Sequence, residues 1–339
     1  MTTCRYYRPL VQTGACRPEG AMLLAGGPRW FTHAEELRRD RSRRVIAAAE
    51  IPDDRLAALT AARAPLAGLA MDRPRIMGIL NVTPDSFSDG GDHNHPAQAL
   101  AQAKRMVEGG ADIVDIGGES TRPGAITVPE EVEIARTAPV IAALRESMDV
   151  PVSIDTRKHA VARAAHAAGA DIVNDVSGFT YDKALAPFCA ENGLPVCIMH
   201  ALGDPQTMQD NPRYDDVLLD VYDFLAAQVA MLAGLGIARE RIVVDPGIGF
   251  GKTIDHNLTL LNGIALFHGL GCPILLGASR KGFIGKLGNA PEASNRAPGS
   301  VAVALAAVAQ GVQILRVHDV VETRQALTLW RAVERGTRG

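Results

Sequence analysis

The sequence predicts an α/β fold, a closed (β/α)8 TIM barrel with an N-terminal extension, and two observations carry this prediction. Eight short apolar runs recur along the chain, each followed by polar residues: 76–80, 112–114, 152–154, 172–173, 196–199, 242–244, 274–276 and 314–317. Ala-rich segments with helical spacing lie between them: 96–108, 129–148, 157–168, 213–235 and 300–310. Near-continuous apolar runs indicate strands buried on both faces, and intervening helices indicate parallel pairing. A doubly wound open sheet is compatible with the pattern, but eight repeats with polar endings favour the barrel.

Length and composition agree with one barrel and an extension. The chain has 339 residues, 47% of them hydrophobic and 22% charged, as is usual for a globular domain. Because such a barrel needs about 250 residues, we expect residues 73–339 to form it and residues 1–72 to pack on it. Within the extension, residues 21–31 read as a hairpin around two glycines, and residues 52–59 as a short helix.

The charge and the cysteines exclude several classes of protein. A net charge of −3 and 4% aromatic residues argue against a nucleic-acid partner. The Arg-rich run 38–44 is interrupted by an acid and is expected to be a solvated surface. Five cysteines without a Cys-x-x-Cys pair favour neither disulfides nor zinc. Residues 1–10 lack the apolar core of a signal peptide, and 301–309 are too few to span a bilayer. We therefore expect a cytoplasmic protein with small-molecule ligands and no membrane partner.

Three polar residues at strand ends point to a heterocyclic ligand. Asp155, Asn174 and Asp245 are far apart in sequence but would meet at one rim of the barrel. Each alone is more often a helix cap. Together, two carboxylates and an amide suit a flat ring that presents several N–H groups on one edge.

Other rim segments point to an anion. Residues 115–124 place two glycines before Ser120, Thr121 and Arg122, which suits phosphate as well as it suits a plain surface turn. The loops after the seventh and eighth runs, where such barrels often bind phosphate, carry Ser279, Lys281, Arg316 and His318. The first run ends at Asn81 and opens into a polar loop. With Asp115 and His318, Asn81 is predicted to contact a Mg²⁺ ion carried in by the phosphate.

The segment 245–253 resembles a nucleotide-binding loop only in part. It ends in Gly251-Lys252-Thr253, but Pro246 stands where a P-loop needs its first glycine, so we reject that motif. Phe250 is an aromatic residue on a Gly-rich loop and is predicted to stack on a ring. The sequence thus predicts a bipartite ligand, a heterocycle with a phosphate group.

These motifs, taken in order, resemble the dihydropteroate synthase family of pterin-binding barrels. The matching segments are 81–91, 117–124, 155–156, 174–175, 245–247, 279–281 and 316–319. The resemblance implies a homodimeric transferase of folate biosynthesis. It would condense 6-hydroxymethyl-7,8-dihydropterin diphosphate with 4-aminobenzoate, releasing pyrophosphate with Mg²⁺. A methyltetrahydrofolate-type methyltransferase and a noncatalytic pterin-binding paralogue are the alternatives. The extension is longer than the lead-in of many family members.

The resemblance also implies a role for each matching residue. The pterin would be bound by Asp155, Asn174, Asp245 and Lys281. The diphosphate and the metal would be bound by Asn81, Asp115, Arg122, Arg316 and His318, with Arg122, Lys281, Arg316 and His318 as the catalytic set. The aminobenzoate would be bordered by Phe87, Thr121, Pro123, Phe250 and Ser279.

Overall fold

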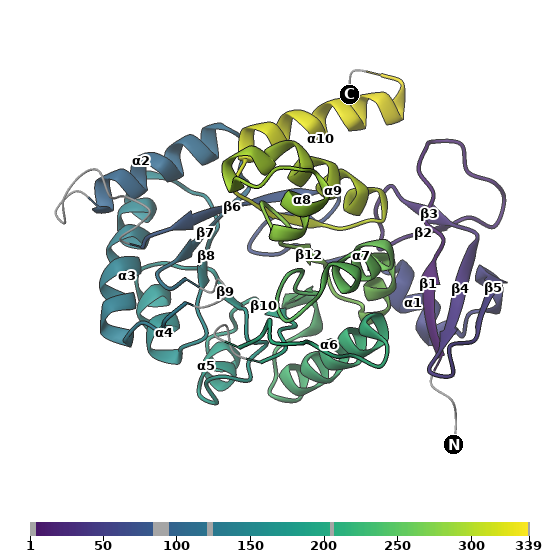
Figure 1. Cartoon of the computed structure of the whole chain (residues 1–339), viewed down its shortest axis with the longest axis horizontal. Helices are drawn as coiled ribbons and strands as arrows, with labels where there is room; N and C mark the ends of the chain where they lie inside the picture. Colours follow the sequence, from purple (N-terminus) through teal and green to yellow (C-terminus); the bar gives the residue numbers. More distant parts are fainter. Residues whose placement is uncertain (1–4, 84–94, 121–124, 204–206, 338–339) are drawn as a thin grey trace.

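The computed structural model describes residues 5–83, 95–120, 125–203 and 207–337, and its main feature is a closed parallel barrel (Figure 1). The eight barrel strands, in chain order, are β6 (Arg75–Asn81), β7 (Ile113–Gly117), β8 (Val152–Asp155), β9 (Ile172–Asp175), β10 (Val196–Met199), β11 (Ile242–Asp245), β12 (Leu275–Leu276) and β13 (Ile314–Val317). They pair in the order β11-β10-β9-β8-β7-β6-β13-β12, and a parallel bridge from Val244 to Ile274 joins the two ends. The predicted (β/α)8 barrel is confirmed.

One predicted strand end is wrong. The run 112–114 was expected to end at Asp115, but β7 begins at Ile113 and continues to Gly117. Its pairing with β8 continues to the same point, because Gly117 pairs with Asp155. Asp115 therefore lies within the strand, two residues before its carboxyl end, and does not follow it.

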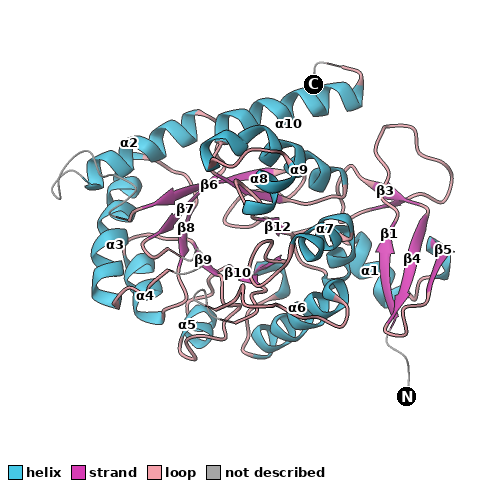
Figure 2. Cartoon of the chain, viewed as in Figure 1, coloured by secondary structure: helices cyan, strands magenta, loops and turns pink. Residues whose placement is uncertain are grey.

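Helices surround the strands, as Figure 2 shows. They are α2 (His95–Glu108), α3 (Glu130–Ser147), α4 (His159–Ala167), α5 (Leu185–Glu191), α6 (Val217–Gly234), α7 (Ile254–Asn262), α8 (Gly282–Leu287), α9 (Ala297–Ala309) and α10 (Val320–Arg335), with the short 3-10 helices η3 (Arg239–Arg241), η4 (Ile264–Leu270) and η5 (Ala293–Arg296). The five helical segments named from the sequence correspond to α2, α3, α4, α6 and α9.

Helix α6 is long and apolar enough to cross a membrane, with a mean hydropathy of 1.5 over 18 residues. In the fold it is a barrel helix. Val221, Leu225 and Val229 on it are buried in the main hydrophobic core, and the Asp216 side chain caps its first turn. The apolar composition therefore reflects packing against the barrel.

The barrel interior is apolar near the amino-terminal ends of the strands. One buried cluster takes a residue from each of seven strands: Met77, Ile113, Ile172, Cys197, Val243, Leu275 and Ile314. Leu66 and Met71, which precede the first barrel strand, belong to the same cluster. The last part of the extension thus packs against this layer at the amino-terminal end of the barrel.

The extension contains more β-structure than the sequence predicted. The hairpin of β2 (Met22–Leu23) and β3 (Trp30–Phe31) is present, as is the short helix α1 (Asp53–Thr60). The structure adds an antiparallel sheet of β1 (Arg5–Pro9), β4 (His33–Arg38) and β5 (Arg43–Ala47), followed by the 3-10 helix η1 (Ala48–Glu50).

The Arg-rich run at the turn between β4 and β5 is only partly a solvated surface. Arg43 and Arg44 are more than half exposed. Arg39, however, forms ion pairs with Asp220 and Asp223 of α6. The run therefore also connects the extension sheet to the barrel. Figure 1 shows this sheet on the side of the barrel where α6 and α7 lie.

Arg63 makes a second connection, and its replacement by methionine is expected to destabilise the fold. Its side chain is buried and donates hydrogen bonds to the carbonyls of Ala58, Ala61 and His268, the last in η4. Burial lowers its pKa to about 10. Arg63→Met leaves buried carbonyls without donors, at about 1–3 kcal/mol, measured by denaturant unfolding.

The matched control is Arg43→Met, since Arg43 is 56% exposed and its ion pair lies on the surface. Any activity that the sequence predicts for the rim should be unchanged per folded molecule in both variants, because the predicted rim residues lie after Arg73. Loss of that activity in stable Arg63→Met protein would show that the extension takes part in it.

Candidate active site

A ring of polar side chains lies one layer above the apolar floor of the barrel. Side chains of a strand alternate between its two faces, so the residue two positions beyond an inward-facing one also faces inward. On four strands that residue is polar: Asp115 on β7, Asn174 on β9, Asp245 on β11 and Arg316 on β13. Asp155 joins them from β8, where it pairs with Asn174 in the sheet register. The predicted convergence of Asp155, Asn174 and Asp245 thus has a simple basis in strand periodicity.

Arg316 organises this ring. Its Nε donates to Asp115 Oδ2 at 2.6 Å, and its Nη2 donates to Asp155 Oδ2 at 2.6 Å. The Asn174 amide lies 3.4 Å from both oxygens of Asp115. Burial alone would lower the pKa of Arg316, but the two carboxylates raise it above its usual value. One guanidinium therefore holds two carboxylates that would otherwise repel each other.

Burial is the largest influence on the two carboxylates Asp155 and Asp245. Burial raises the pKa of Asp155 to about 7, although Arg316 opposes the shift. Burial likewise raises the pKa of Asp245 to about 6, although the Gly247 amide donates to its Oδ1 at 2.7 Å. Desolvated carboxylates of this kind gain most from a ligand that brings N–H donors. Gly277 leaves room for such a ligand, because a Cβ there would lie 3.5 Å from Asp245 Oδ2.

Phe250 and Lys281 form a second part of the site. The Lys281 ammonium lies 3.9 Å from the centroid of the Phe250 ring. The Lys281 stem passes close to the backbone of Gly249, where a Cβ would lie 3.2 Å from its Cδ. An aromatic face and a cation thus stand together beside the carboxylate ring, which suits a flat heterocycle with an anionic phosphate group.

Ser279 and His318 contact each other between the loops that follow β12 and β13. Ser279 Oγ lies 3.0 Å from His318 Nδ1 and accepts from the His318 backbone amide at 3.1 Å. The intervening Arg280 has a φ of +56° and forms an ion pair with Asp319. Arg280 thus has a carboxylate partner at the start of α10, while the two predicted cations of these loops, Lys281 and Arg316, lie in the site.

The three predicted metal ligands, Asn81, Asp115 and His318, lie on different strands and loops of the barrel mouth, and their role stays a prediction. The described residues contain no group of three His, Cys, Asp or Glu side chains suited to a metal ion, a search that does not include Asn81. Asp115 is fully buried beneath Arg316. Asn81 lies nearer the mouth, since its Oδ1 is 3.7 Å from the place a Cβ would take at Gly117. Asn81 is therefore the member of the set best placed to offer an oxygen.

Four predicted site residues lie outside the described part of the chain: Phe87, Thr121, Arg122 and Pro123. Their roles stay predictions from the sequence.

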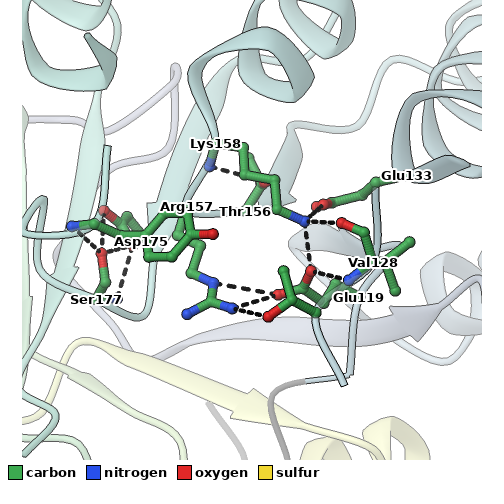
Figure 3. A network of polar contacts seen from close by, with 10 residues as sticks. Glu119, Val128, Glu133, Thr156, Arg157, Lys158, Asp175 and Ser177 are labelled. Carbon is green, nitrogen blue, oxygen red and sulfur yellow. Dashed lines mark hydrogen bonds and ion pairs between the residues drawn. The ribbon is translucent and has the colours of Figure 1, made fainter. Parts of the chain in front are cut away.

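Sequence reasoning missed a buried network beside the ring (Figure 3). Lys158 Nζ forms ion pairs with Glu119 and Glu133, and it donates to the Val128 carbonyl at 2.7 Å. Arg157 pairs with Glu119 at 3.0 Å. Glu119 Oε2 in turn accepts from the Val128 backbone amide at 2.9 Å. The network therefore joins Glu119 to Val128, the residues on either side of 120–127. Two consecutive cations just after β8, Arg157 and Lys158, were the feature of the sequence that could have indicated it.

Asp245→Asn is expected to weaken binding of the pterin that the resemblance implies by about 1–3 kcal/mol, because the substitution keeps the size but turns one acceptor into a donor. The new amide would face the N–H groups of the ligand, and the Gly247 amide already donates to this side chain. Calorimetric titration with a phosphate-free pterin measures the loss. Affinity equal to that of the unsubstituted protein would rule out Asp245 as the anchor of the ring edge.

Comparisons with known proteins agree with this geometry. Residues 77–318 match the family described as pterin binding enzyme. The dihydropteroate synthase of Synechocystis sp. is 48% identical over 263 residues, which cover 76% of this chain and 91% of that protein. A solved dihydropteroate synthase of Xanthomonas albilineans with 4-aminobenzoic acid has a TM-score of 0.75 and 46% identity, covering 79% and 96% of the two chains. Another from that organism, in complex with 7,8-dihydropteroate, has a TM-score of 0.72 and 43% identity, covering 78% and 95%.

Proposed function

The chain belongs to the family of pterin binding enzymes and, within it, to the dihydropteroate synthases, and from this premise we propose which residues bind each part of its substrates. The enzyme is a transferase of folate biosynthesis. It condenses 6-hydroxymethyl-7,8-dihydropterin diphosphate with 4-aminobenzoate to give 7,8-dihydropteroate and pyrophosphate. The observation that carries the assignment of residues is the buried ring of carboxylates around Arg316.

Asp155, Asn174 and Asp245 bind the N–H edge of the pterin in this proposal. The raised pKa values of Asp155 and Asp245 support it, because N–H donors would relieve the desolvation of both carboxylates. Lys281 adds a cation beside the ring, and Phe250 offers the adjoining aromatic face. Ser279 and His318 line the neighbouring loops, and their mutual contact supports a common role at the border between diphosphate and aminobenzoate.

The reaction proceeds, in our proposal, by dissociative substitution at the methylene carbon of the pterin. The carbon–oxygen bond breaks and its electron pair leaves with pyrophosphate, while the pterin ring delocalises the positive charge. The amine nitrogen of aminobenzoate then forms the new bond and releases a proton to water. Since an arylamine is a weak, neutral nucleophile, cations near the leaving group contribute most.

Arg316 and His318, together with Arg122, are the residues proposed to stabilise the departing pyrophosphate. The charge of Arg316 is shared with Asp115 and Asp155, so it also organises the pterin ring site. No covalent enzyme nucleophile is required.

Mg²⁺ is proposed to arrive with the diphosphate and to bind the amide oxygen of Asn81. Protein-bound Mg²⁺ usually keeps several waters and takes one or two protein oxygens plus phosphate, so a single amide oxygen at the mouth fits. Asp115 fits less well because Arg316 occupies its carboxylate. His318 suits the phosphate better than the ion, since Mg²⁺ prefers oxygen ligands. When bound, the ion would neutralise charge on the pyrophosphate oxygens.

A homodimer in the cytoplasm completes the proposal. Helix α10 supports an interface between copies, because Val321, Leu329 and Val333 on it are 60%, 62% and 81% exposed. Sedimentation velocity of the purified protein tests this, and a monomer at all concentrations would contradict it.

The function is tested by mixing the purified protein with both substrates and Mg²⁺. Pyrophosphate and dihydropteroate should appear together, and omission of aminobenzoate should abolish the second product. Chelation of the ion should slow turnover. Methyl transfer from methyltetrahydrofolate, or pterin binding without any product, would instead identify one of the two rival activities.

A further inference from the structure

The loop between β11 and α7 is fastened to the loop that follows β10. At Gly247, whose φ is +67°, a Cβ would lie 1.9 Å from the His200 carbonyl oxygen, so only glycine fits. The Tyr214 hydroxyl donates to the Gly251 carbonyl at 2.8 Å. The two loops are thus in direct backbone contact, and Phe250 stands on one of them.

Lys252 lies at the centre of this contact. Its side chain is 3% exposed, and its Nζ lies 3.0 Å from His200 Nδ1, 3.2 Å from the His200 carbonyl oxygen and 2.9 Å from the Phe250 carbonyl oxygen. The ion pairs found among the described residues include none at Lys252. A buried ammonium without a carboxylate partner is costly, so three acceptors placed around it indicate a site built for that group.

We propose that Lys252 is a positioning residue of the synthase. Its ammonium ties the loop after β10 to the loop after β11, and through the Phe250 carbonyl it holds the Phe250 ring against the Lys281 ammonium. The chain of contacts runs from His200 through Lys252 and Phe250 to Lys281, with the final step at 3.9 Å. Lys252 therefore acts on the pterin only through its neighbours, and the inference rests on the proposed function of Phe250 and Lys281.

The role of Lys252 rests on its contacts, since its surroundings weaken its charge. Burial lowers the pKa of Lys252 to about 7, the Asp245 carboxylate opposes this shift, and the Lys281 ammonium adds to it. Burial also lowers the pKa of His200 to about 3, so its ring is neutral and Nδ1 can accept from the ammonium. The pKa of His256 on α7 is lowered by burial and by Lys252, against the opposing Asp255 carboxylate. Tyr214, whose ring contacts those of His200 and His256, is a further titratable neighbour.

A double-mutant cycle between Lys252→Met and Phe250→Leu tests the proposal. If Lys252 acts through Phe250, each single variant should lose roughly tenfold to a hundredfold in kcat/KM for the pterin diphosphate, and the double variant should lose no more than the worse single one. Losses that multiply would overturn the proposal, and so would a Lys252→Met enzyme with near-normal kcat/KM. Lys286→Met, on the exposed face of α8, is the matched control and should leave kcat/KM unchanged.

Two additions keep the test decisive. Should Lys252→Met fail to fold, Lys252→Gln is measured in its place. Because its amide can still donate to the Phe250 carbonyl, its kcat/KM should fall less than tenfold, and a larger loss would contradict the positioning role. Calorimetric binding of a phosphate-free pterin repeats the cycle without turnover. If the binding losses of the two variants are not additive, Lys252 positions Phe250, even if the protein releases no pyrophosphate. If the losses are additive and the protein is an active synthase, the positioning role is rejected and the proposed function stands.

Discussion

Replacing Arg316 with methionine is expected to reduce turnover by about a thousandfold, the upper end for loss of one preorganised charge. The substitution removes the guanidinium that donates to Asp115 and Asp155. Two buried carboxylates would then face each other without a cation, and the pKa of Asp155, already raised by burial, would rise further. The enzyme would lose both the ordered pterin ring site and a charge near the leaving group.

Steady-state kinetics and pterin calorimetry measure this loss. Arg324→Met is the matched control, because Arg324 pairs with Asp112 and its side chain is 25% exposed, close to the 19% of Arg316. Asp112 lies at the other end of the barrel, just before β7, so this control should lose stability but little turnover per folded molecule. Turnover of Arg316→Met within tenfold of the unsubstituted enzyme would reject the central role given to Arg316.

Replacing Lys158 with methionine is expected to destabilise the protein by about 3–5 kcal/mol, as removal of one member of a buried ion network does. Lys158 is 3% exposed and pairs with Glu119 and Glu133, of which Glu133 is 1% exposed. Burial raises the pKa of Glu133, and the Lys158 ammonium opposes that shift. Without Lys158, both carboxylates would remain buried with less compensation. Denaturant unfolding measures the change.

A second substitution separates charge from packing in this network. Lys158→Met combined with Glu133→Gln removes one charge of each sign and should recover part of the lost stability. Lys183→Met, at an exposed position, should have little effect. If the double variant were instead less stable than Lys158→Met, the destabilisation by Lys158→Met would come from lost packing and not from the unpaired Glu133 carboxylate.

The sequence was most informative about features that depend on the residues of a single strand. Apolar runs located every barrel strand, and strand periodicity brings Asp155, Asn174 and Asp245 to one mouth. It was wrong about Asp115, because an apolar run was taken to stop at its first polar residue, although Ile116 and Gly117 continue the strand.

Features that depend on distant partners were not predicted. The sheet of the extension escaped notice because its strands carry charged residues, which neutralise one another across strands, as Arg8 and Glu35 do at 2.6 Å. The pairs of Arg316 with Asp155, and of Lys158 with Glu119, join residues far apart in the chain. No spacing rule within a single strand or helix specifies such pairs.

The barrel is held together unevenly, and this should be visible in hydrogen exchange. Between β7 and β8 the register runs over four residue pairs, from Val114 to Gly117, whereas a single bridge joins Val244 of β11 to Ile274, just before the two-residue β12. Val244 and Val114 offer a matched pair of backbone amides, since each donates to a proline carbonyl just before the neighbouring strand, at 2.9 Å and 3.0 Å. Because local opening needs fewer broken contacts at the short strand, the Val244 amide should take up deuterium sooner than that of Val114.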